Sequence, residues 1–582
     1  MVERIPRFSH GELSGAAGTL APPVRNANIA GTLVEAAAAR PDADAVRTVR
    51  TRGRTRERTR GRARAARVSA ITFAELDERS NALAGGLARR GLERGQRVCV
   101  FVRPGPDLVA CAFALFKLGA VPVLIDPGMG RANVARCVER MAPRALIGVP
   151  AAHLLRRLYP RAFRTVELVF TAGVPTPGGG PTLARLASDG DRSPLLAGLE
   201  ADAPAAILFT SGSTGPPKGV AYTHGMFQAQ VRALRSCYGF EPGEVDAACF
   251  PLFALFSPAL GMTCAFCELD PSHPARCDPE RIVAAIEATG ATSSFGSPAI
   301  WRRVVPWCAE RGIVLDGLRR VLVAGAPIPP ELIAAFHRIL PAGADVHTPY
   351  GATESLPVST ISGHEILESA EFGLAHGLGT CVGRPAAGID VRLIPLCDEP
   401  IAEWGDLREV PDGEPGEMCV SGPVVTREYA FDPAATAAAK IRDGKRFWHR
   451  MGDVGRRTAD GRLWFLGRKA HRIETRAGLV LPVPGEVVLN GHVAVGRSAL
   501  VGVGAHGDER AVFVVEPADP RAVRGDAARS ALRTELLALA GTRAASAVAS
   551  EVLFHTGFPV DVRHNAKIDR EALKRWAEER LA

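Results

Sequence analysis

Strand and helix patterns alternate along most of this 582-residue chain, and this alternation limits the fold more than any other feature. The segment ITFAELDERSNALAGGLARRGL predicts a strand end and then an amphipathic helix, because Leu76, Leu83 and Leu87 recur at helical spacing. The strand RVCVFV follows, and then a buried helix that ends at Gly119 before the strand VPVLI. Alternating strands and helices form mostly parallel, helix-covered sheets. We therefore predict an α/β fold.

The length and a later change of pattern predict more than one domain, since single cores stop growing at about 250–300 residues. After about residue 386 the pattern changes to short β-type segments with Gly and Asp turns, and from Gly467 a smaller unit begins. We predict an irregular lead-in over residues 1–28 and a large N-terminal domain over 29–466, with helix-covered sheets and a β-type subdomain. A small, mobile α+β C-terminal domain is predicted over 467–582.

The basic charge of the chain belongs to one segment. The formal net charge is +9, and residues 47–67 alone contain ten Arg and one Glu, so the remaining residues sum to zero. This Arg-rich insert alternates Arg with Thr, Gly and Ala, which predicts a solvated, flexible surface insertion. Binding of an anionic surface or a nucleic acid by the insert is the alternative. For the protein as a whole we predict no nucleic-acid partner.

Cysteine usage and the absence of long apolar runs predict a cytoplasmic protein. Cys99, Cys111 and Cys419 lie inside apolar runs, which is typical of buried thiols in a reduced compartment. The N-terminus has no apolar signal-peptide region, and the longest apolar stretch, residues 108–125, contains Lys117, Gly119 and Pro122, so we predict no transmembrane segment. The spacing of Cys264, Cys267, His273 and Cys277 imitates a zinc knuckle, but the first two cysteines continue an apolar run, and we expect ordinary thiols.

The sharpest chemical signal is residues 210–219, TSGSTGPPKG, directly after the apolar strand AAILF. Glycines let the backbone approach a phosphate closely, and free N–H groups and hydroxyls can donate to its oxygens. Lys218 adds a positive charge, and the spacing is not that of a Walker A loop. The predicted nucleotide-binding residues here are Thr210, Ser211, Gly212, Ser213, Thr214, Gly215 and Lys218.

This loop resembles the signature of AMP-forming adenylating enzymes, which include acyl-CoA synthetases, nonribosomal-peptide adenylation domains and luciferases. Other motifs of that superfamily follow in order to the end of the chain, among them YGATE at residues 350–354. The resemblance implies ATP and Mg²⁺ as cofactors. It implies that Tyr350 stacks near adenine, that Thr353 donates to the α-phosphate and that Glu354 holds Mg²⁺, a hard cation that prefers carboxylate oxygens.

Four further sites follow from the same resemblance. Asp453 in HRMGDVG matches the family Asp that binds the ribose hydroxyls, and Arg468 in LGRK matches the Arg at the hinge between the domains. The turn of Gly325, Ala326 and Pro327 resembles the adenine-side loop. Lys567 in RHNAKIDRE aligns with the small-domain lysine that bridges the attacking carboxylate and the α-phosphate, although the usual Ser-Gly-Lys is here Asn-Ala-Lys.

Three departures narrow the resemblance. Acyl-CoA synthetases commonly have His where this chain has Ala254, and often have Lys where it has Glu474; the usual hinge Asp or Lys is Ala470. The segments FALFSPALG, YGATESLPV, GTCVG, HRMGDVG and FPVDVRHNAKI look most like the olefin β-lactone synthetases. That subfamily converts a long-chain 2-alkyl-3-hydroxy acid and ATP into a β-lactone. The resemblance also implies assembly with neighbouring hydrocarbon or β-lactone pathway enzymes.

The predicted function is therefore adenylation of a β-hydroxy acid followed by attack of its own 3-hydroxyl, giving a β-lactone, AMP and diphosphate. Phe253, Phe256 and residues 296–298 are expected to border the acyl pocket. No base for the hydroxyl is assigned, because His471 and His564 flank the motifs but a lone histidine is more often structural. The alternatives are a fatty acyl-AMP ligase or acyl-CoA synthetase and, more distantly, a non-catalytic binding module.

Overall fold

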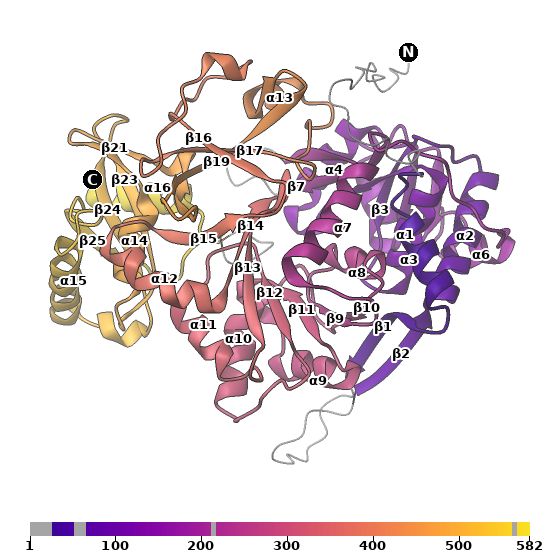
Figure 1. Ribbon diagram of the computed structural model, residues 1–582, viewed down its shortest axis with the longest axis horizontal. Helices are drawn as coiled ribbons and strands as arrows, with labels where there is room; N and C mark the ends of the chain where they lie inside the picture. The colour runs from indigo at the N-terminus through magenta and orange to yellow at the C-terminus, as the bar shows by residue number, and fades with distance from the viewer. Residues whose placement is uncertain (1–25, 52–65, 211–216, 561–566) are drawn as a thin grey trace.

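The computed structural model describes residues 26–51, 66–210, 217–560 and 567–582. Two large sheets with their helices form one side of the molecule, and a smaller unit built from the C-terminal residues lies on the other side (Figure 1). The predicted α/β class is confirmed. No helix among the described residues is long and apolar enough to cross a membrane.

The first large sheet has six strands in the order β6-β5-β3-β4-β7-β8. They are β3 (Arg97–Phe101), β4 (Val121–Leu124), β5 (Ala145–Gly148), β6 (Leu168–Thr171), β7 (Pro204–Thr210) and β8 (Lys218–Thr223). All neighbours pair in parallel except β7 and β8, which form a hairpin that sets Thr210 opposite Lys218. The phosphate-type loop predicted at residues 210–219 therefore joins these two strands.

The predicted buried helix after β3 is confirmed as α3 (Pro106–Leu118). It ends where Gly119 takes a left-handed conformation with φ of 74°, which a residue with a Cβ adopts only with strain. Helices α1 (Gly31–Ala39), α2 (Phe73–Arg89) and α7 (His224–Tyr238) complete the layer between the two large sheets, and α4 (Arg131–Met141), α5 (Pro150–Leu158) and α6 (Leu183–Asp189) follow β4, β5 and β6.

The second large sheet combines a parallel part with an antiparallel extension. Its first part comprises β1 (Asp44–Thr51), β2 (Ala66–Thr72), β9 (Val245–Ala248), β10 (Thr263–Phe266), β11 (Ser293–Gly296), β12 (Arg320–Val323) and β13 (Asp345–Ala352). All neighbours in this part pair in parallel except the edge strands β1 and β2, which pair antiparallel. Side chains of α9 (Pro279–Thr289), α10 (Pro298–Ala309) and α11 (Pro330–His337) pack against it in one apolar cluster. This layer brings the end of β13 next to β7 and β8, where the nucleotide motifs meet.

The extension contains the predicted β-type subdomain. It comprises β14 (Ser355–Ser362), β15 (Thr380–Pro385), β16 (Asp390–Ile394), β17 (Gly416–Ser421), β18 (Lys440–Asp443), β19 (Arg446–Arg457) and β20 (Leu463–Arg468), with α12 (Gly363–Ala375) and α13 (Pro433–Ala439). Because β19 and β20 pair antiparallel, Asp453 lies opposite Arg468. The last strand of this sheet ends at Arg468.

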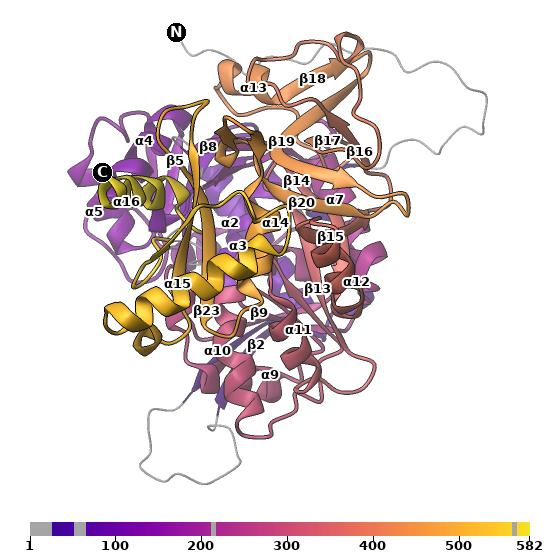
Figure 2. The ribbon, with the colours of Figure 1, turned by 90° about the vertical axis from the view of Figure 1, so that its left-hand side faces the viewer.

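The C-terminal unit is a small sheet with helices on both faces. After the hairpin of β21 (Ile473–Thr475) and β22 (Gly478–Val480), strands β23 (Val495–Val503), β24 (Arg510–Pro517) and β25 (Glu551–Phe554) form its sheet. Helices α14 (Pro482–Asn490) and α15 (Asp526–Gly541) pack on one face and α16 (Arg570–Leu581) on the other. Figure 2 looks onto this unit, in front of the rest of the molecule.

The prediction of a flexible Arg-rich insert is wrong at the edges of the insert. Residues 47–51 and 66–67 of the Arg-rich insert belong to the paired strands β1 and β2, where the guanidinium of Arg47 donates to Asp44 and to the carbonyl of Thr289. Residues 26–28, the described end of the predicted lead-in, have no helix or strand, and Asn28 is buried there and donates to the carbonyl of Phe116 at 2.8 Å. Local composition could not show these long-range partners. Residues 1–25 and 52–65 lie outside the described residues.

Candidate active site

A cavity of about 630 Å³ lies where the two large sheets and the C-terminal unit meet. Of the predicted site residues, Lys218, Gly325, Thr353, Glu354, Arg468 and Lys567 all line it. Ala326, Pro327, Tyr350 and Asp453 do not line it, and Ser211, Gly212, Ser213, Thr214 and Gly215 fall outside the described residues. Six predicted residues from five separate parts of the sequence thus meet around one space.

Glu354 lies in the turn between β13 and β14 and is held on two sides. Its Oε1 accepts the hydroxyl of Tyr429 at 2.7 Å, and its carbonyl accepts the N–H of Thr426 at 2.8 Å. The ammonium of Lys218 lies 5.0 Å from the centre of the Tyr429 ring, a cation–π distance. The hydroxyl of Tyr222 donates to the carbonyl of Thr353. The acidic turn is therefore fixed beside the lysine of the phosphate-type loop.

Tyr350 and Arg468 hold the Asp453 carboxylate from two directions. The Tyr350 hydroxyl donates to Oδ2 at 2.6 Å, and Nε of Arg468 lies 3.1 Å from Oδ1. Burial raises the pKa of Asp453, while Arg468, Tyr350 and the Lys567 ammonium lower it. Lys567 thus contributes positive charge here, although it comes from the C-terminal unit, just before α16. Sequence matching alone placed these residues in one site but did not show these contacts.

Lys440 and His449 form a buried basic pair behind Glu354 that the sequence did not reveal. Burial lowers the pKa of Lys440 to about 7, against the raising effect of Glu354. Burial and the Lys440 ammonium hold the pKa of His449 well below its usual range. His449 lines the cavity, and its Nδ1 contacts the carbonyl of Ala439 at 3.2 Å, so this nitrogen carries the proton of the neutral ring. Nearby charge on a bound phosphate would raise both pKa values.

A second network missed by the sequence reasoning lines the cavity near the chain connection to the C-terminal unit. The Arg450 guanidinium pairs with Glu417 at 2.7 Å, and both side chains are buried. Lys469 approaches the same carboxylate at 3.0 Å. A glutamate inside the apolar strand GEMCV was the available signal, since such a charge requires a buried partner. This pairing fixes the residue that follows Arg468.

The other part of the cavity is apolar. Phe227, Phe250, Phe253, Phe256 and Phe295 line it. The rings of Phe253 and Phe295 stack with centroids 3.8 Å apart, and Phe227 packs against Phe256 at 6.1 Å. We call these five residues the aromatic half, and we call Lys218, Thr353, Glu354, Arg468 and Lys567 the polar half. Of the residues expected to border an acyl pocket, Phe253, Phe256, Gly296 and Ser297 line this cavity and Pro298 does not.

The three residues at which this chain departs from acyl-CoA synthetases do not all line the cavity. Ala470 lines it, Ala254 is buried but does not, and Glu474 accepts the Arg472 guanidinium at 2.8 Å outside it. Burial lowers the pKa of His471 to about 3, so this ring is neutral; His564 is outside the described residues. The cysteines are free thiols, and no metal-type group among the described residues contains Cys264, Cys267, His273 or Cys277.

The comparisons with known proteins agree with this site. Residues 34–430 match the AMP-binding enzyme family. The chain is 46% identical to the olefin β-lactone synthetase of Stenotrophomonas maltophilia, over 96% of this chain and 99% of that protein. It is 44% identical to the olefin β-lactone synthetase of Xanthomonas campestris, over 94% and 97%. The chain belongs to the AMP-binding enzyme family and is an enzyme of the AMP-forming ligase type.

Solved structures of other proteins share the fold. ATP-bound MatB from Rhodopseudomonas palustris superposes with a TM-score of 0.75 at 20% identity, over 96% of this chain and all of that one. The amide bond synthetase McbA from Marinactinospora thermotolerans gives a TM-score of 0.76 at 24% identity, over 95% of this chain and all of that one. At these identities the likeness establishes the fold alone.

Proposed function

We propose that this enzyme adenylates a long-chain 2-alkyl-3-hydroxy acid with ATP and then closes a β-lactone by attack of the 3-hydroxyl. The observation that carries the proposal is one cavity in which a cationic and carboxylate-bearing half adjoins an aromatic half. Near full-length similarity to two olefin β-lactone synthetases supports the choice of product. ATP and the acid would meet with the phosphates in the polar half and the alkyl chains in the aromatic half.

In the first step a carboxylate oxygen of the acid attacks the α-phosphorus, and the bond to diphosphate breaks. Lys567 and Lys218 line the cavity and can offset negative charge that develops on the phosphate oxygens, while Thr353 can donate to them. Residues 211–215 would cradle the phosphates with Thr210 at the loop's start, and Asp453 would accept the ribose hydroxyls. Tyr350 and the turn of Gly325, Ala326 and Pro327 would face adenine.

Mg²⁺ fits the polar half because Glu354 offers a carboxylate there, a ligand that hard cations prefer. One oxygen of that carboxylate already accepts the Tyr429 hydroxyl, which fixes its direction and leaves lone pairs for a cation. Bound there with ATP, Mg²⁺ would neutralise part of the phosphate charge. Glu354 is thus the residue proposed to hold the metal.

In the second step the 3-hydroxyl oxygen attacks the acyl carbon, the bond to AMP breaks and the hydroxyl proton is released. Both reacting groups belong to one bound molecule, so the aromatic half acts by orienting the chain and by excluding water from the activated ester. The stacked Phe253 and Phe295 rings give that wall little freedom to deform. No external thiol takes part in this step.

We further propose that residues 467–582 move as a small domain about Arg468 and bring Lys567 into the cavity for adenylation. The sheet of the large part ends at Arg468, and Lys567 is the cavity-lining residue that comes from beyond α15. We also propose that the enzyme acts in the cytoplasm, where it would assemble with neighbouring enzymes of its pathway.

The test is a product assay with ATP, Mg²⁺ and a synthetic 2-alkyl-3-hydroxy acid, with and without CoA. The proposal predicts β-lactone and AMP in equal amounts without CoA. A thioester that appears only with CoA would instead establish an acyl-CoA synthetase, and accumulation of acyl-AMP alone would establish an acyl-AMP ligase. Full turnover by a variant lacking residues 52–65 is also expected, because those residues belong to the Arg-rich insert, whose composition predicts a solvated surface insertion.

A further inference from the structure

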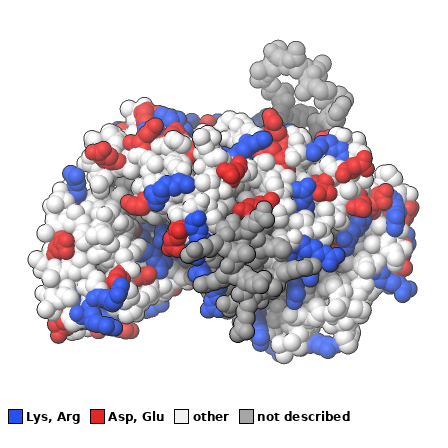
Figure 3. Space-filling view, turned by 90° about the horizontal axis from the view of Figure 1, so that it is seen from below, with Lys and Arg blue, Asp and Glu red and all other residues white. Residues whose placement is uncertain are grey.

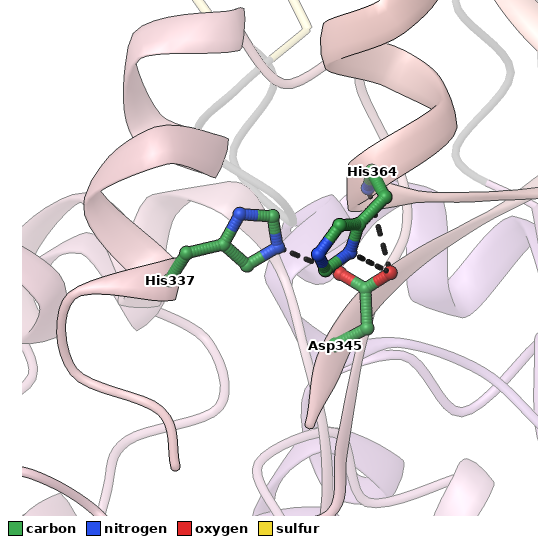
Figure 4. A group of neighbouring side chains, drawn as sticks. All are labelled: His337, Asp345 and His364. Carbon is green, nitrogen blue, oxygen red and sulfur yellow. Dashed lines mark hydrogen bonds and ion pairs between the residues drawn. The ribbon is translucent and has the colours of Figure 1, made fainter. Parts of the chain in front are cut away.

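A second group of metal-type ligands lies outside the cavity, at the start of β13. His337 ends α11, Asp345 begins β13 and His364 is in the first turn of α12. Figure 4 shows both imidazole rings turned toward the one carboxylate. None of the three residues lines the active-site cavity. The group is therefore separate from the adenylation machinery.

The distances within the group suit a single ion. Nε2 of His337 lies 2.8 Å from Oδ1 of Asp345, and Nδ1 of His364 lies 2.9 Å from Oδ2. One ligand atom from each residue can be chosen so that all three lie within 4.8 Å of one another. In a site of this kind each ligand atom lies about 2.0–2.2 Å from the ion, so two ligand atoms are at most about 4.4 Å apart. Small side-chain rotations would therefore bring the three ligand atoms within bonding distance of one ion.

The backbone around the group is arranged for this approach. A Cβ on Gly363 would lie 2.6 Å from Oδ1 of Asp345, so only glycine lets the start of α12 come so close to the carboxylate. Ser362 and Glu365 form a reciprocal capping box that fixes the turn carrying His364. The Val346 N–H donates to Asp345 Oδ1 at 2.7 Å and orients the carboxylate. Three elements thus hold the three ligands with little freedom.

The ligand chemistry selects the class of metal. Two imidazole nitrogens and one carboxylate oxygen are typical of Zn²⁺ and neighbouring transition metals, whereas Mg²⁺ and Ca²⁺ prefer all-oxygen sites. His337 and Asp345 are half-buried at 22% and 16% side-chain exposure, while His364 is 65% exposed, which leaves an open path and room for water ligands. Glu368, one helical turn after His364, can supply a further oxygen from the same helix face.

We propose that His337, Asp345 and His364 form a Zn²⁺-type site that fastens α11, β13 and α12 together. The ion would take the place of the protons that now lie between each imidazole and the carboxylate. Strand β13 runs from this site to the loop of Thr353 and Glu354, over roughly 25 Å at about 3.3 Å per residue. The ion would therefore stabilise the fold at a distance from the reaction and take no part in it.

The probe is ZnCl₂ added to the full chain after chelator treatment, followed by titration calorimetry and metal analysis. Relative to the wild type, Zn²⁺ binding is expected to be at least about tenfold weaker in His364→Gln and to be lost in His337→Gln/His364→Gln. The reason is that even a residue that acts on a metal through one of its ligands contributes about 10–100-fold in affinity. Zn²⁺ is expected to raise the Tm of the wild type and not that of the double variant. ATP–diphosphate exchange should be unchanged in His364→Gln.

The matched control is His273→Gln. His273 bonds to Asp270 at 3.0 Å on the surface, an imidazole–carboxylate pair without a second imidazole, so Zn²⁺ binding should persist in this variant. Equal Zn²⁺ stoichiometry and affinity in the wild type and in His364→Gln would overturn the proposal, because binding would then belong to cysteines or to other groups. Absence of any Zn²⁺ binding to the wild type would overturn it as well and would show that the three side chains only form hydrogen bonds.

Discussion

The polar and aromatic halves of the cavity are built in different ways. In the polar half, charged groups are held by fixed partners: Glu354 by Tyr429, and Asp453 beside it by Arg468 and Tyr350. In the aromatic half, packing rather than hydrogen bonding fixes the rings, as in the stacked pair Phe253 and Phe295. The difference indicates that activation of the acid and binding of its alkyl chains are separable. Electrostatic preorganisation in the polar half serves activation, and the shape of the aromatic half serves binding.

Replacement of Lys567 by Ala should have the largest effect. Loss of one preorganised cation at the developing charge typically reduces turnover roughly 10²–10³-fold, and we expect this in ATP–diphosphate exchange, with the KM for the acid little changed. Arg575→Ala is the control, since Arg575 is an exposed cation on α16 of the same unit. Unchanged exchange in Lys567→Ala would remove this residue from the polar half.

Replacement of Phe253 by Ala should weaken the other half alone. Burial of a Phe side chain is worth about 1.5–3 kcal/mol, so kcat/KM for a long-chain acid should fall about tenfold or more while the KM for ATP stays constant. Phe372→Ala, which removes a ring that is 49% exposed, is the matched control. A similar rise in the KM for ATP would show that the two halves are not separable.

Replacement of Tyr429 by Phe should give a smaller effect in the polar half. It removes the hydroxyl that donates to Glu354, and a hydrogen bond to a charged group is worth about 1.5–3 kcal/mol. We expect about a tenfold loss of adenylation, partly restored by raised Mg²⁺, measured by ATP–diphosphate exchange. Tyr159→Phe, at a tyrosine that does not line the cavity, should behave as the wild type. An equal loss at all Mg²⁺ concentrations would contradict the positioning role.

The smallest predicted effects are on the free energy of unfolding. Its dependence on pH should have opposite signs for the buried groups that lie beside the two halves. Beside the aromatic half, burial raises the pKa of Asp246 to about 7, so its contribution is present at low pH and is lost as pH rises from about 4 to 7. Behind the polar half, burial lowers the pKa of Lys440 to about 7, so its contribution is lost as pH falls from about 10.5 to 7.

Urea unfolding against pH checks both slopes. Relative to Asp246→Asn, the wild type should lose at most about 1.4 kcal/mol of unfolding free energy per pH unit between pH 4 and 7. Relative to Lys440→Met, it should gain at most about the same amount per unit between pH 7 and 10. Parallel pH profiles of wild type and variant would show that the group titrates alike in the folded and unfolded chain.

Much of the fold and of the polar half was predictable from the sequence, because local patterns encode them. The helix that ends at Gly119 was predictable because its sequence is apolar nearly throughout and a glycine stands at its end. The YGATE and HRMGDVG motifs are contiguous, so a match to the family identified Glu354 and Asp453 directly.

Partners that meet only in space were not predictable. The pairing of Tyr429 with Glu354 spans 75 residues, and that of Arg450 with Glu417 spans 33. No local pattern specifies such pairs. The Arg-rich insert shows the same limit, since its edges are strands that pair with each other and, at Arg47 and Thr48, with the distant strand β10. The net charge of the chain likewise does not describe its surface, since Figure 3 shows basic and acidic side chains interspersed over one face of the molecule.

The central claim is that the aromatic half delivers the 3-hydroxyl to the acyl-adenylate formed in the polar half. The most direct test compares a 2-alkyl-3-hydroxy acid with its 3-deoxy analogue, without CoA, in two assays: ATP–diphosphate exchange and AMP release over many turnovers. The account predicts exchange with both acids but sustained AMP release, with β-lactone, only with the hydroxy acid. Equal AMP release from both acids would mean that water or another nucleophile resolves the adenylate, and the account would be contradicted.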